Sequence, residues 1–189
     1  ANIGLAALAD AARLSRAPIA RDLGFALGPR VNAGGRVGQA DLGVRLLTTH
    51  DPAEAAASAA QLDALNQERR AIEQAVTDAA LAGAIMAPGC CVVAGEGWHP
   101  GVIGIVASRL KEKLGRPAIV IAVQDDGLAK GSGRSITGVD LGAAVLAAKD
   151  HGLLLAGGGH AMAAGLTVAA DGIAALDGFL NERLAAPVA

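Results

Sequence analysis

The pattern of apolar and polar positions divides the chain into three segments. Residues 1–50 carry short helical runs interrupted by glycine and proline, beginning with IGLAALADAARL, for which Asn2 is the candidate N-cap. The later run LGFALGPRVNAGGRVGQADLG holds too many glycines for one continuous helix. We therefore expect its GPRVNAGGR part to form a loop.

Residues 51–87 carry one long helical pattern, with Asp51 as candidate N-cap and Pro52 in the first helical position. Its thin apolar stripe consists of Leu62, Leu65, Ile72, Val76 and Ala79. About thirty helical residues would span about 45 Å, which is long for a compact domain of this size. We interpret the helix as a connector between two bodies, and the alternative is one side of a helical bundle.

From residue 88 onward the pattern alternates between strands and helices. The run CVVAGEG predicts a strand. The run PGVIGIVASRLKEKLG predicts an amphipathic helix that ends at Gly115, and PAIVIAVQ predicts a buried strand. Together these form a βαβ unit. Asp125–Gly127 predict a hairpin turn, followed by a strand at AKGSGRSI and a helix at LGAAVLAAKDHG. The end of the chain predicts a glycine-rich loop running into a strand at LLLAGGGHAMAAGLTV, then a closing helix.

Composition excludes several classes of protein. Hydrophobic residues make up 52% of the 189 residues and charged residues 18%, which suits a sizeable core. Aromatic residues make up 2%, which argues against a protein that stacks bases along a row of rings. The formal net charge of −2 excludes a wholly basic nucleic-acid-binding protein, but a local cationic site remains open. No apolar stretch is long enough for a transmembrane helix, and the N-terminus lacks the order of a signal peptide.

The two cysteines, Cys90 and Cys91, are adjacent, which disfavours an ordinary disulfide. They begin an apolar run, so we expect them to be buried as small hydrophobic residues in a reducing cytoplasm. The chain opens on Ala1 within a helical pattern, and we expect it to be a piece of a longer protein.

Two motifs in the second half could hold an anion. Ser132 and Arg134 offer a hydroxyl and a guanidinium, and the neighbouring glycines let a ligand approach. The alternative interpretation of this first motif is a strand with a glycine bulge. Gly158 and Gly159 belong to a triple-glycine run before His160, which could donate to a phosphate oxygen. The alternative for this second motif is a tight turn with a solvated histidine.

Two weaker candidates complete the set. His99 lies directly before a helix N-terminus, which attracts anions, and the alternative is a packed Trp98 followed by a turn. Arg30 and Arg36 flank an asparagine and two glycines, which suits an oxyanion contact, and the alternative is an interdomain loop with solvated arginines. The chain has no P-loop, no GxSxG or GxGxxG motif, and no histidine or cysteine pair at metal-ligand spacing.

Taken in order, the motifs resemble one family, the RecJ exonucleases of the DHH phosphoesterase superfamily. The matching runs are LGFALGPRVNAGGRVGQADLGVRLL, LDALNQERRAIEQ, GEGWHPGVIGIVASRLKEKLGRPAIVIA, KGSGRSITGVDLGAAV and GGGHAMAAGLTV. They keep the family's order and approximate spacing over essentially the whole chain. One departure is NAGGR, where the family usually has NAAGR.

The resemblance implies an α/β fold in three parts: a short helical remnant of a catalytic domain (1–50), a long connecting helix (51–87) and a small mixed-sheet DHH-associated domain (88–189). RecJ enzymes are hydrolases that use Mn²⁺ or Mg²⁺, held by aspartates and an Asp-His-His motif in an N-terminal catalytic domain. This chain has no Asp-His-His triplet. We therefore expect it to hold no metal and to be inactive alone, since hydrolysis needs those ligands.

The resemblance also implies roles for individual residues. Ser132 and Arg134 would bind the 5′ phosphate of single-stranded DNA, and Arg30 and Arg36 would contact phosphates on the catalytic side. His160, with Gly158 and Gly159, would face the cleft near the scissile phosphate, with His99 nearby. The implied partner is 5′-phosphorylated single-stranded DNA in repair and recombination, with no membrane, and with a single-strand-binding protein or a helicase as candidate protein partner.

Two alternatives stay open. One is another DHH phosphoesterase, acting on short oligoribonucleotides or cyclic dinucleotides. The other is a non-catalytic nucleic-acid-binding module similar to the C-terminal domain of alanyl-tRNA synthetase. The GPRVNAGGR run and the long helix argue against the other phosphoesterase. An Asp-His-His motif preceding Ala1 would distinguish the nuclease from the non-catalytic module.

Overall fold

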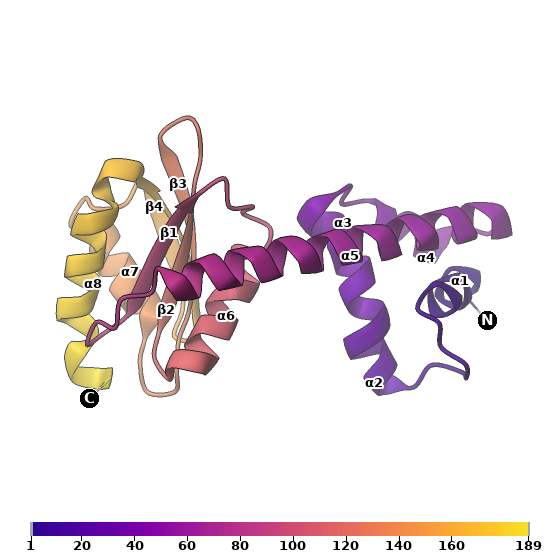
Figure 1. The fold of residues 1–189 in the computed structure, drawn as a ribbon, viewed down its shortest axis with the longest axis horizontal. Helices are drawn as coiled ribbons and strands as arrows, with labels where there is room; N and C mark the ends of the chain where they lie inside the picture. Colours follow the sequence, from indigo (N-terminus) through magenta and orange to yellow (C-terminus); the bar gives the residue numbers. More distant parts are fainter. Residues whose placement is uncertain (1, 189) are drawn as a thin grey trace. The chain divides into compact units, whose positions relative to one another are not determined.

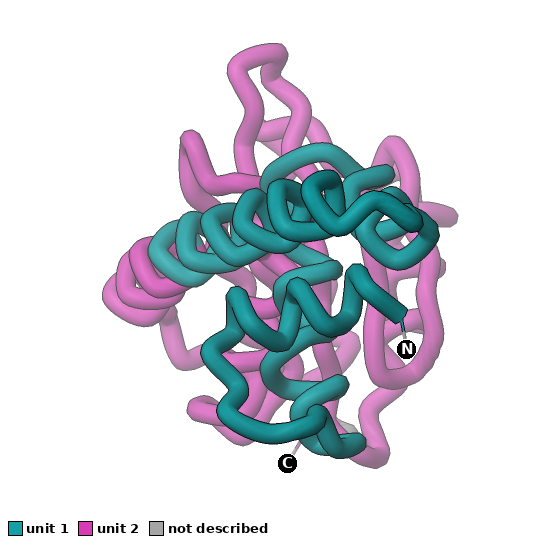
Figure 2. Tube along the Cα trace, turned by 90° about the vertical axis from the view of Figure 1, so that its right-hand side faces the viewer, with its two compact units in different colours: residues 1–72 teal, residues 73–189 magenta. Residues whose placement is uncertain are grey.

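The computed structural model describes residues 2–188 and divides into two compact units, residues 1–72 and residues 73–189. The division falls within the long helix α5 (Pro52–Ala82), so each unit includes part of that helix (Figure 2). None of the described helices combines the length and the apolar character that crossing a lipid bilayer requires.

The first unit is helical. Before α5 it contains α1 (Ile3–Ala11), α2 (Ala20–Asp22), the π-helical turn η1 (Leu23–Leu27), α3 (Gly28–Val37) and α4 (Leu42–Thr48). The predicted cap of α1 is confirmed, because Asn2 Oδ1 accepts a hydrogen bond of 2.9 Å from the Leu5 amide. The buried leucines of α1, η1, α4 and α5 form one core: Leu8, Leu27, Leu42, Leu46 and Leu62.

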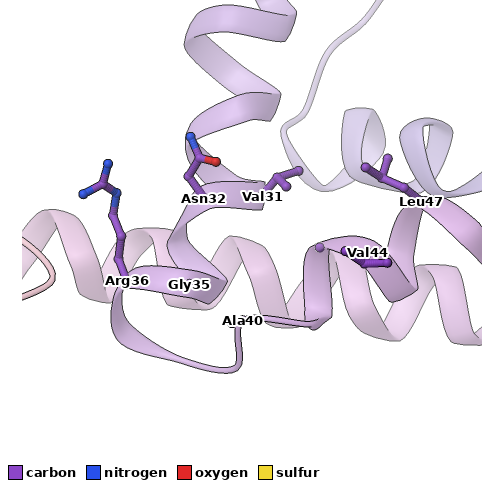
Figure 3. A pocket seen from close by; sticks show the side chains of 8 residues that line it. Val31, Asn32, Gly35, Arg36, Ala40, Val44 and Leu47 are labelled. Carbon is purple, nitrogen blue, oxygen red and sulfur yellow. The ribbon is translucent and has the colours of Figure 1, made fainter.

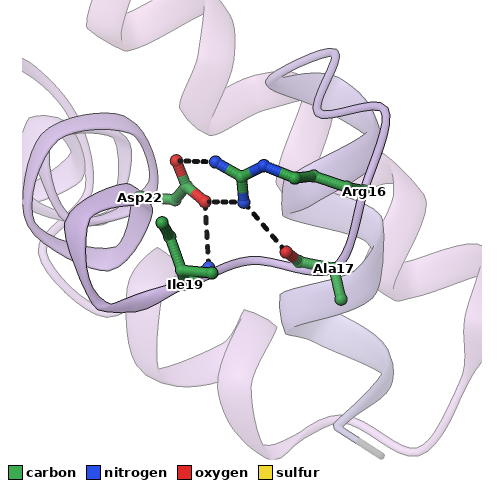
Figure 4. A network of polar contacts seen from close by, with 4 residues as sticks. All are labelled: Arg16, Ala17, Ile19 and Asp22. Atoms are coloured by element: carbon green, nitrogen blue, oxygen red, sulfur yellow. Dashed lines mark hydrogen bonds and ion pairs between the residues drawn. The ribbon is translucent and has the colours of Figure 1, made fainter.

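The start of the helical run from α2 to α3 is held by a carboxylate (Figure 4). Asp22 Oδ2 accepts hydrogen bonds from the Ile19 amide, at 2.9 Å, and from Arg16 Nη1, at 2.6 Å. The Arg16 hydrogen bond, followed by that of the Ile19 amide, lowers the pKa of Asp22. Arg16 Nη1 also donates to the Ala17 carbonyl, so one guanidinium closes the loop that leads into α2.

The predicted loop at GPRVNAGGR is wrong, because these residues form helix α3. Helical backbone runs from Ala20 to Val37 through the π-helical turn. Its glycines serve close packing: a Cβ atom at Gly28 would lie 2.7 Å from the Leu23 carbonyl oxygen, and one at Gly34 would lie 2.9 Å from the Gln39 carbonyl oxygen. The chain leaves the helix only at Gly38.

Helix α5 begins as predicted, since Asp51 Oδ1 accepts a 2.9 Å hydrogen bond from the Ala53 amide. Its buried stripe is less apolar than expected. The buried positions along it are Ala55, Ser58, Ala59, Leu62, Asn66, Arg69, Glu73, Val76, Thr77 and Ala80. Ala79, predicted to lie on the stripe, is exposed, and its neighbour Ala80 is buried instead.

The second unit is built on one five-stranded sheet (Figure 1). Its elements are β1 (Cys91–Glu96), α6 (Ile103–Leu114), β2 (Ala118–Val123), β3 (Leu128–Arg134), α7 (Leu141–Asp150), β4 (Ala156–His160), β5 (Ala163–Ala169), the 3₁₀ turn η2 (Ala170–Gly172) and α8 (Ile173–Val188). The strand order is β1-β2-β3-β5-β4, with β1 and β2 parallel and all other neighbours antiparallel. The predicted βαβ unit and mixed sheet are confirmed.

Helices cover the two faces of this sheet unequally. Helix α6 packs on β2 and β3 on one face, while α7 and α8 build the main core on the other (Figure 1). The buried Glu73 of α5 forms an ion pair with Arg109 of α6. This pair fixes the last turns of α5 to the helix on the first face.

The predicted turns hold. Gly115 ends α6 in the left-handed conformation at φ 65°, and Gly127 has φ 79° in the hairpin between β2 and β3. Cys90 and Cys91 are free and buried, as expected, and burial raises the pKa of both thiols.

The triple-glycine run is strand β4, not the predicted loop. The turn of its hairpin lies at residues 161–162, and the start of α7 packs against it. A Cβ atom at Gly142 of α7 would lie 2.9 Å from the His160 backbone. The start of α7 therefore closely approaches the end of the glycine strand.

Two neighbouring glycines of β4 should respond differently to substitution. A Cβ atom at Gly159 would lie 2.6 Å from Ala164 Cα, whereas one at Gly158 would meet nothing within 4 Å. We expect Gly159→Ala to lower the free energy of unfolding by about 2 kcal/mol and Gly158→Ala to change it by less than about 1 kcal/mol. Urea unfolding followed by circular dichroism measures both, and equal midpoints for the two variants would contradict the packing described here.

Candidate functional site

The alternation of β3 puts its polar side chains on one face. Lys130, Ser132 and Arg134 point to the face that carries α6, while Ala129, Gly131 and Gly133 are buried on the other face. Arg134 Nη1 donates to Ser132 Oγ at 3.0 Å and to the Gly133 carbonyl at 2.8 Å. The guanidinium is thus folded back along the strand onto the serine hydroxyl.

The first turn of α6 lies directly over this pair. A Cβ atom at Gly104 would lie 2.9 Å from Arg134 Nη2 and 3.0 Å from Ser132 Oγ. A helix N-terminus carries a partial positive charge, which adds to the charge of the guanidinium. Hydroxyl, guanidinium and helix start together form a site that favours an anion.

The strand register brings the glycine motif to the same face. Ser132 is paired with Gly165 of β5, which is paired with Gly158 of β4. In the next row, Arg134 is paired with Ala163, and Ala163 with His160. The predicted residues Ser132, Arg134, Gly158 and His160 therefore share one sheet face, on adjacent rows.

The part of this face formed by β4 and β5 is open. A Cβ atom at Gly158 or at Gly165 would meet nothing within 4 Å, and His160 is exposed. Gly159 points the other way by alternation, and a side chain there would meet Ala163 and Ala164 of β5. Gly158 can therefore face a ligand, whereas the geometry of Gly159 points to a role in the hairpin.

His99 holds the turn that leads into α6. Its Nδ1 accepts a 3.0 Å hydrogen bond from the Gly101 amide, and its carbonyl accepts one of 3.1 Å from the Val102 amide. With Nδ1 as acceptor, the neutral ring carries its proton on Nε2. His99 lines a hollow with Trp98, Gln124 and other residues of the loops after β1 and β2. This placement gives His99 a structural task, and its contact with substrate stays a prediction.

Arg30 is engaged within the first unit. Its Nε donates to Asp63 Oδ1 at 2.7 Å and its Nη1 donates to the Ala26 carbonyl at 2.7 Å. The two side chains are only 15% and 20% exposed, so the pair ties α3 to α5. This geometry favours a structural role for Arg30, and its phosphate contact stays a prediction.

The other arginine of this motif lies at a surface hollow (Figure 3). Asn32, Gly35 and Arg36 are exposed along one face of α3, at the i, i+3 and i+4 spacing of neighbours on a helix. They line the hollow together with Val44 and Leu47 of α4, which are 63% and 37% exposed. A polar helix face and exposed apolar side chains thus border one depression.

The described residues form no cluster of metal ligands. Within residues 2–188, no three or more histidine, cysteine, aspartate or glutamate side chains come together in a way that could hold a metal ion. The residues present therefore do not suit the Mn²⁺ or Mg²⁺ that the resemblance implied for a complete enzyme.

Residues 87–186 match the DHHA1 domain family, and the chain belongs to that family. Within it, the chain is similar to the single-stranded-DNA-specific exonuclease RecJ. It is 46% identical to RecJ of Dickeya dadantii over 171 residues and 44% identical to RecJ of Escherichia coli over 178 residues. These matches cover 86% and 89% of this chain, but 29% and 31% of the two relatives.

The fold agrees with a solved relative. The crystal structure of RecJ in complex with Mg²⁺ from Thermus thermophilus has a TM-score of 0.88 and 34% sequence identity, over 98% of this chain and 29% of that chain. The predicted resemblance and the predicted fold class are thereby confirmed. The chain spans less than a third of the length of each of these three proteins.

Sequence reasoning missed two glycines of the site. Gly104 lies inside an amphipathic helix, where a glycine lowers stability. This cost could have indicated that the position needs a residue without a side chain. Gly165 lies inside a predicted strand and becomes informative only through its pairing with Ser132 and Gly158.

The Arg30–Asp63 pair predicts a stability effect that needs no substrate. We expect Arg30→Ala to lower the free energy of unfolding by about 1–3 kcal/mol, because it leaves a mostly covered carboxylate without its cation. The exposed Arg70 of α5 is the matched control, and Arg70→Ala should cost less than about 0.5 kcal/mol. Urea unfolding measures both, and an Arg30→Ala variant as stable as the control would show that this arginine does not support the fold.

Proposed function

We propose that the chain is the substrate-binding portion of a RecJ-like 5′-to-3′ exonuclease, and that it holds the 5′ phosphate of single-stranded DNA. The observation that supports this most is the Arg134 guanidinium folded onto Ser132 beneath the first turn of α6. The similarity to single-stranded-DNA-specific exonucleases supplies the nature of the substrate.

The charge of the site suits the end of a strand. A terminal phosphate carries about two negative charges at neutral pH and three free oxygens, whereas an internal phosphodiester carries one charge. A guanidinium binds phosphate oxygens in a bidentate manner, and a hydroxyl and a helix start add further stabilisation. A site of this kind therefore distinguishes an end from the interior of a strand.

The strand would continue from this site over the open surface beside Gly158 and Gly165, with His160 in the neighbouring row. Bare backbone lets a sugar or base approach a sheet closely. Asn32 and Arg36 would contact phosphates through the first unit. The proposal includes a role in DNA repair and recombination in the reducing cytoplasm. A single-strand-binding protein or a helicase would be the protein partner.

Two other functions are less well supported. An oligoribonucleotide or cyclic-dinucleotide phosphodiesterase, or a non-catalytic module of the synthetase kind, would also use a DHHA1 domain. The matches to RecJ are 44% and 46% identical over 89% and 86% of this chain, so they reach well beyond the DHHA1 domain, and this favours the exonuclease.

The end-phosphate site predicts a preference that one residue controls. The 189-residue chain should bind a 5′-phosphorylated single strand at least about tenfold more tightly than the same strand with a 5′ hydroxyl, because charged hydrogen bonds are lost with the phosphate. Arg134→Ala should remove this preference. Fluorescence anisotropy at two salt concentrations measures it, since contacts to internal phosphates weaken with salt for both strands.

Arg183→Ala is the control for this experiment, because Arg183 is exposed on α8, a helix of the opposite sheet face. It should leave the preference unchanged. Equal binding of the two strands by the unmodified chain would contradict the proposed function.

A second prediction concerns hydrolysis. We expect the chain, incubated with 5′-labelled single-stranded DNA and Mn²⁺, to release no mononucleotide above the buffer background, since its described residues form no metal cluster. Denaturing gel electrophoresis checks this. Release that depends on Mn²⁺, stops with a chelator and persists through purification would show that the chain carries its own catalytic site.

A further inference from the structure

Lys130 lies on the same face and the same strand as the proposed phosphate ligands. It precedes Ser132 by two residues on β3, and Arg134 follows Ser132 by two, so the three side chains form one row along the strand. Lys130 is exposed. Residues two apart in a strand are about 6.6 Å apart, so the Ser132 side chain lies between those of Lys130 and Arg134 in this row.

The row is arranged so that both cations can reach one ligand. Arg134 already leans toward Ser132, as the 3.0 Å bond from its Nη1 to the serine Oγ shows. Lys130 carries a flexible four-carbon stem that can extend along the strand toward Ser132. Its cross-strand neighbours on this face are Ala122 of β2 and Thr167 of β5, and neither is charged.

The nearest carboxylates on its own hairpin belong to the turn. Asp126 Oδ1 accepts a 3.0 Å hydrogen bond from the Leu128 amide, which holds the end of the hairpin. On the face itself, its cross-strand neighbours Ala122 and Thr167 have small, uncharged side chains.

We propose that Lys130 is the second cation of the end-phosphate site, and that Lys130 and Arg134 together select a terminal phosphate dianion over a singly charged phosphodiester. This inference rests on the proposed function. One cation balances the charge of a diester, whereas a terminal phosphate carries about two negative charges. The second cation therefore adds affinity only for the end group, and this makes Lys130 a determinant of specificity.

The test compares three single strands of the same sequence. One ends in a 5′ phosphate, one in a 5′ phosphate capped as its methyl ester, which carries a single charge, and one in a 5′ hydroxyl. The proteins are the unmodified chain, Lys130→Gln, Lys130→Arg and Arg134→Ala. Lys149→Gln is the matched control, because Lys149 is an exposed lysine of α7 on the opposite sheet face.

We expect Lys130→Gln to weaken binding of the phosphorylated strand by about three- to tenfold and binding of the other two strands by less than about twofold. Its affinity for the phosphorylated strand then approaches its affinity for the methyl ester. Lys130→Arg should retain most of the preference, and Lys149→Gln should resemble the unmodified chain. Circular dichroism confirms that each variant is folded.

The following outcomes would overturn the inference. An equal loss on all three strands would place Lys130 at internal phosphates, and no loss would remove it from the site. If the unmodified chain prefers the phosphate, and Lys130→Gln does not alter that preference, only the role of Lys130 fails. If the unmodified chain binds all three strands alike, the proposed function fails together with it.

Discussion

The proposed site depends on how closely one helix approaches one strand. Helix α6 begins over Ser132 and Arg134 because residue 104 has no side chain, and a Cβ atom there would come within 3.0 Å of both polar groups. The βαβ connection fixes where α6 crosses the sheet, since β1 and β2 must run parallel with α6 between them. The buried Glu73 of α5 reaches the same helix through Arg109. The Glu73–Arg109 ion pair and Gly104 thus both help to fix the position of α6. That position places the start of the helix next to the Arg134 guanidinium.

The glycines at and beside the candidate site fall into two kinds, which differ in what an added Cβ atom would meet. At Gly104, Gly142 and Gly159, an added Cβ atom would meet backbone or polar atoms within 3.0 Å, so the fold explains these residues. At Gly158 and Gly165 the added atom would meet nothing within 4 Å, and neither residue has a positive φ. A glycine inside a strand costs conformational entropy. No contact within the described unit requires these two glycines, and the register places them beside Ser132.

Most elements of the second unit could be predicted, because strands and helices there have distinct periods and clear turn residues. Gly115 and Gly127 both adopt the left-handed conformations that their positions indicated. The two wrong loop predictions, at GPRVNAGGR in the first unit and at the triple glycine in the second, have the same cause. In both places the glycines were interpreted as a sign of irregular backbone, whereas Gly34 and Gly159 lie in regular elements and allow close approach of neighbouring backbone. Which meaning a glycine has depends on its neighbours in space, and one sequence does not show them.

The candidate site shows the same limit in another form. Ser132 and Arg134 stand two residues apart on a predicted strand, so their common face followed from alternation alone. Strand β3 pairs with β5, and β5 pairs with β4, which is a non-consecutive strand order. This pairing brings Gly158 and His160 to the same face. The same pairing explains how a chain with a net charge of −2 and few aromatic residues could hold an anionic strand. Its cations need not cover a surface, because Lys130 and Arg134 flank a single hydroxyl beside bare backbone. Under the proposed function, a local charge of this kind would attract the end of a strand more than its length. The selectivity of the site would then come from the charge of the terminal group and not from the overall charge of the protein.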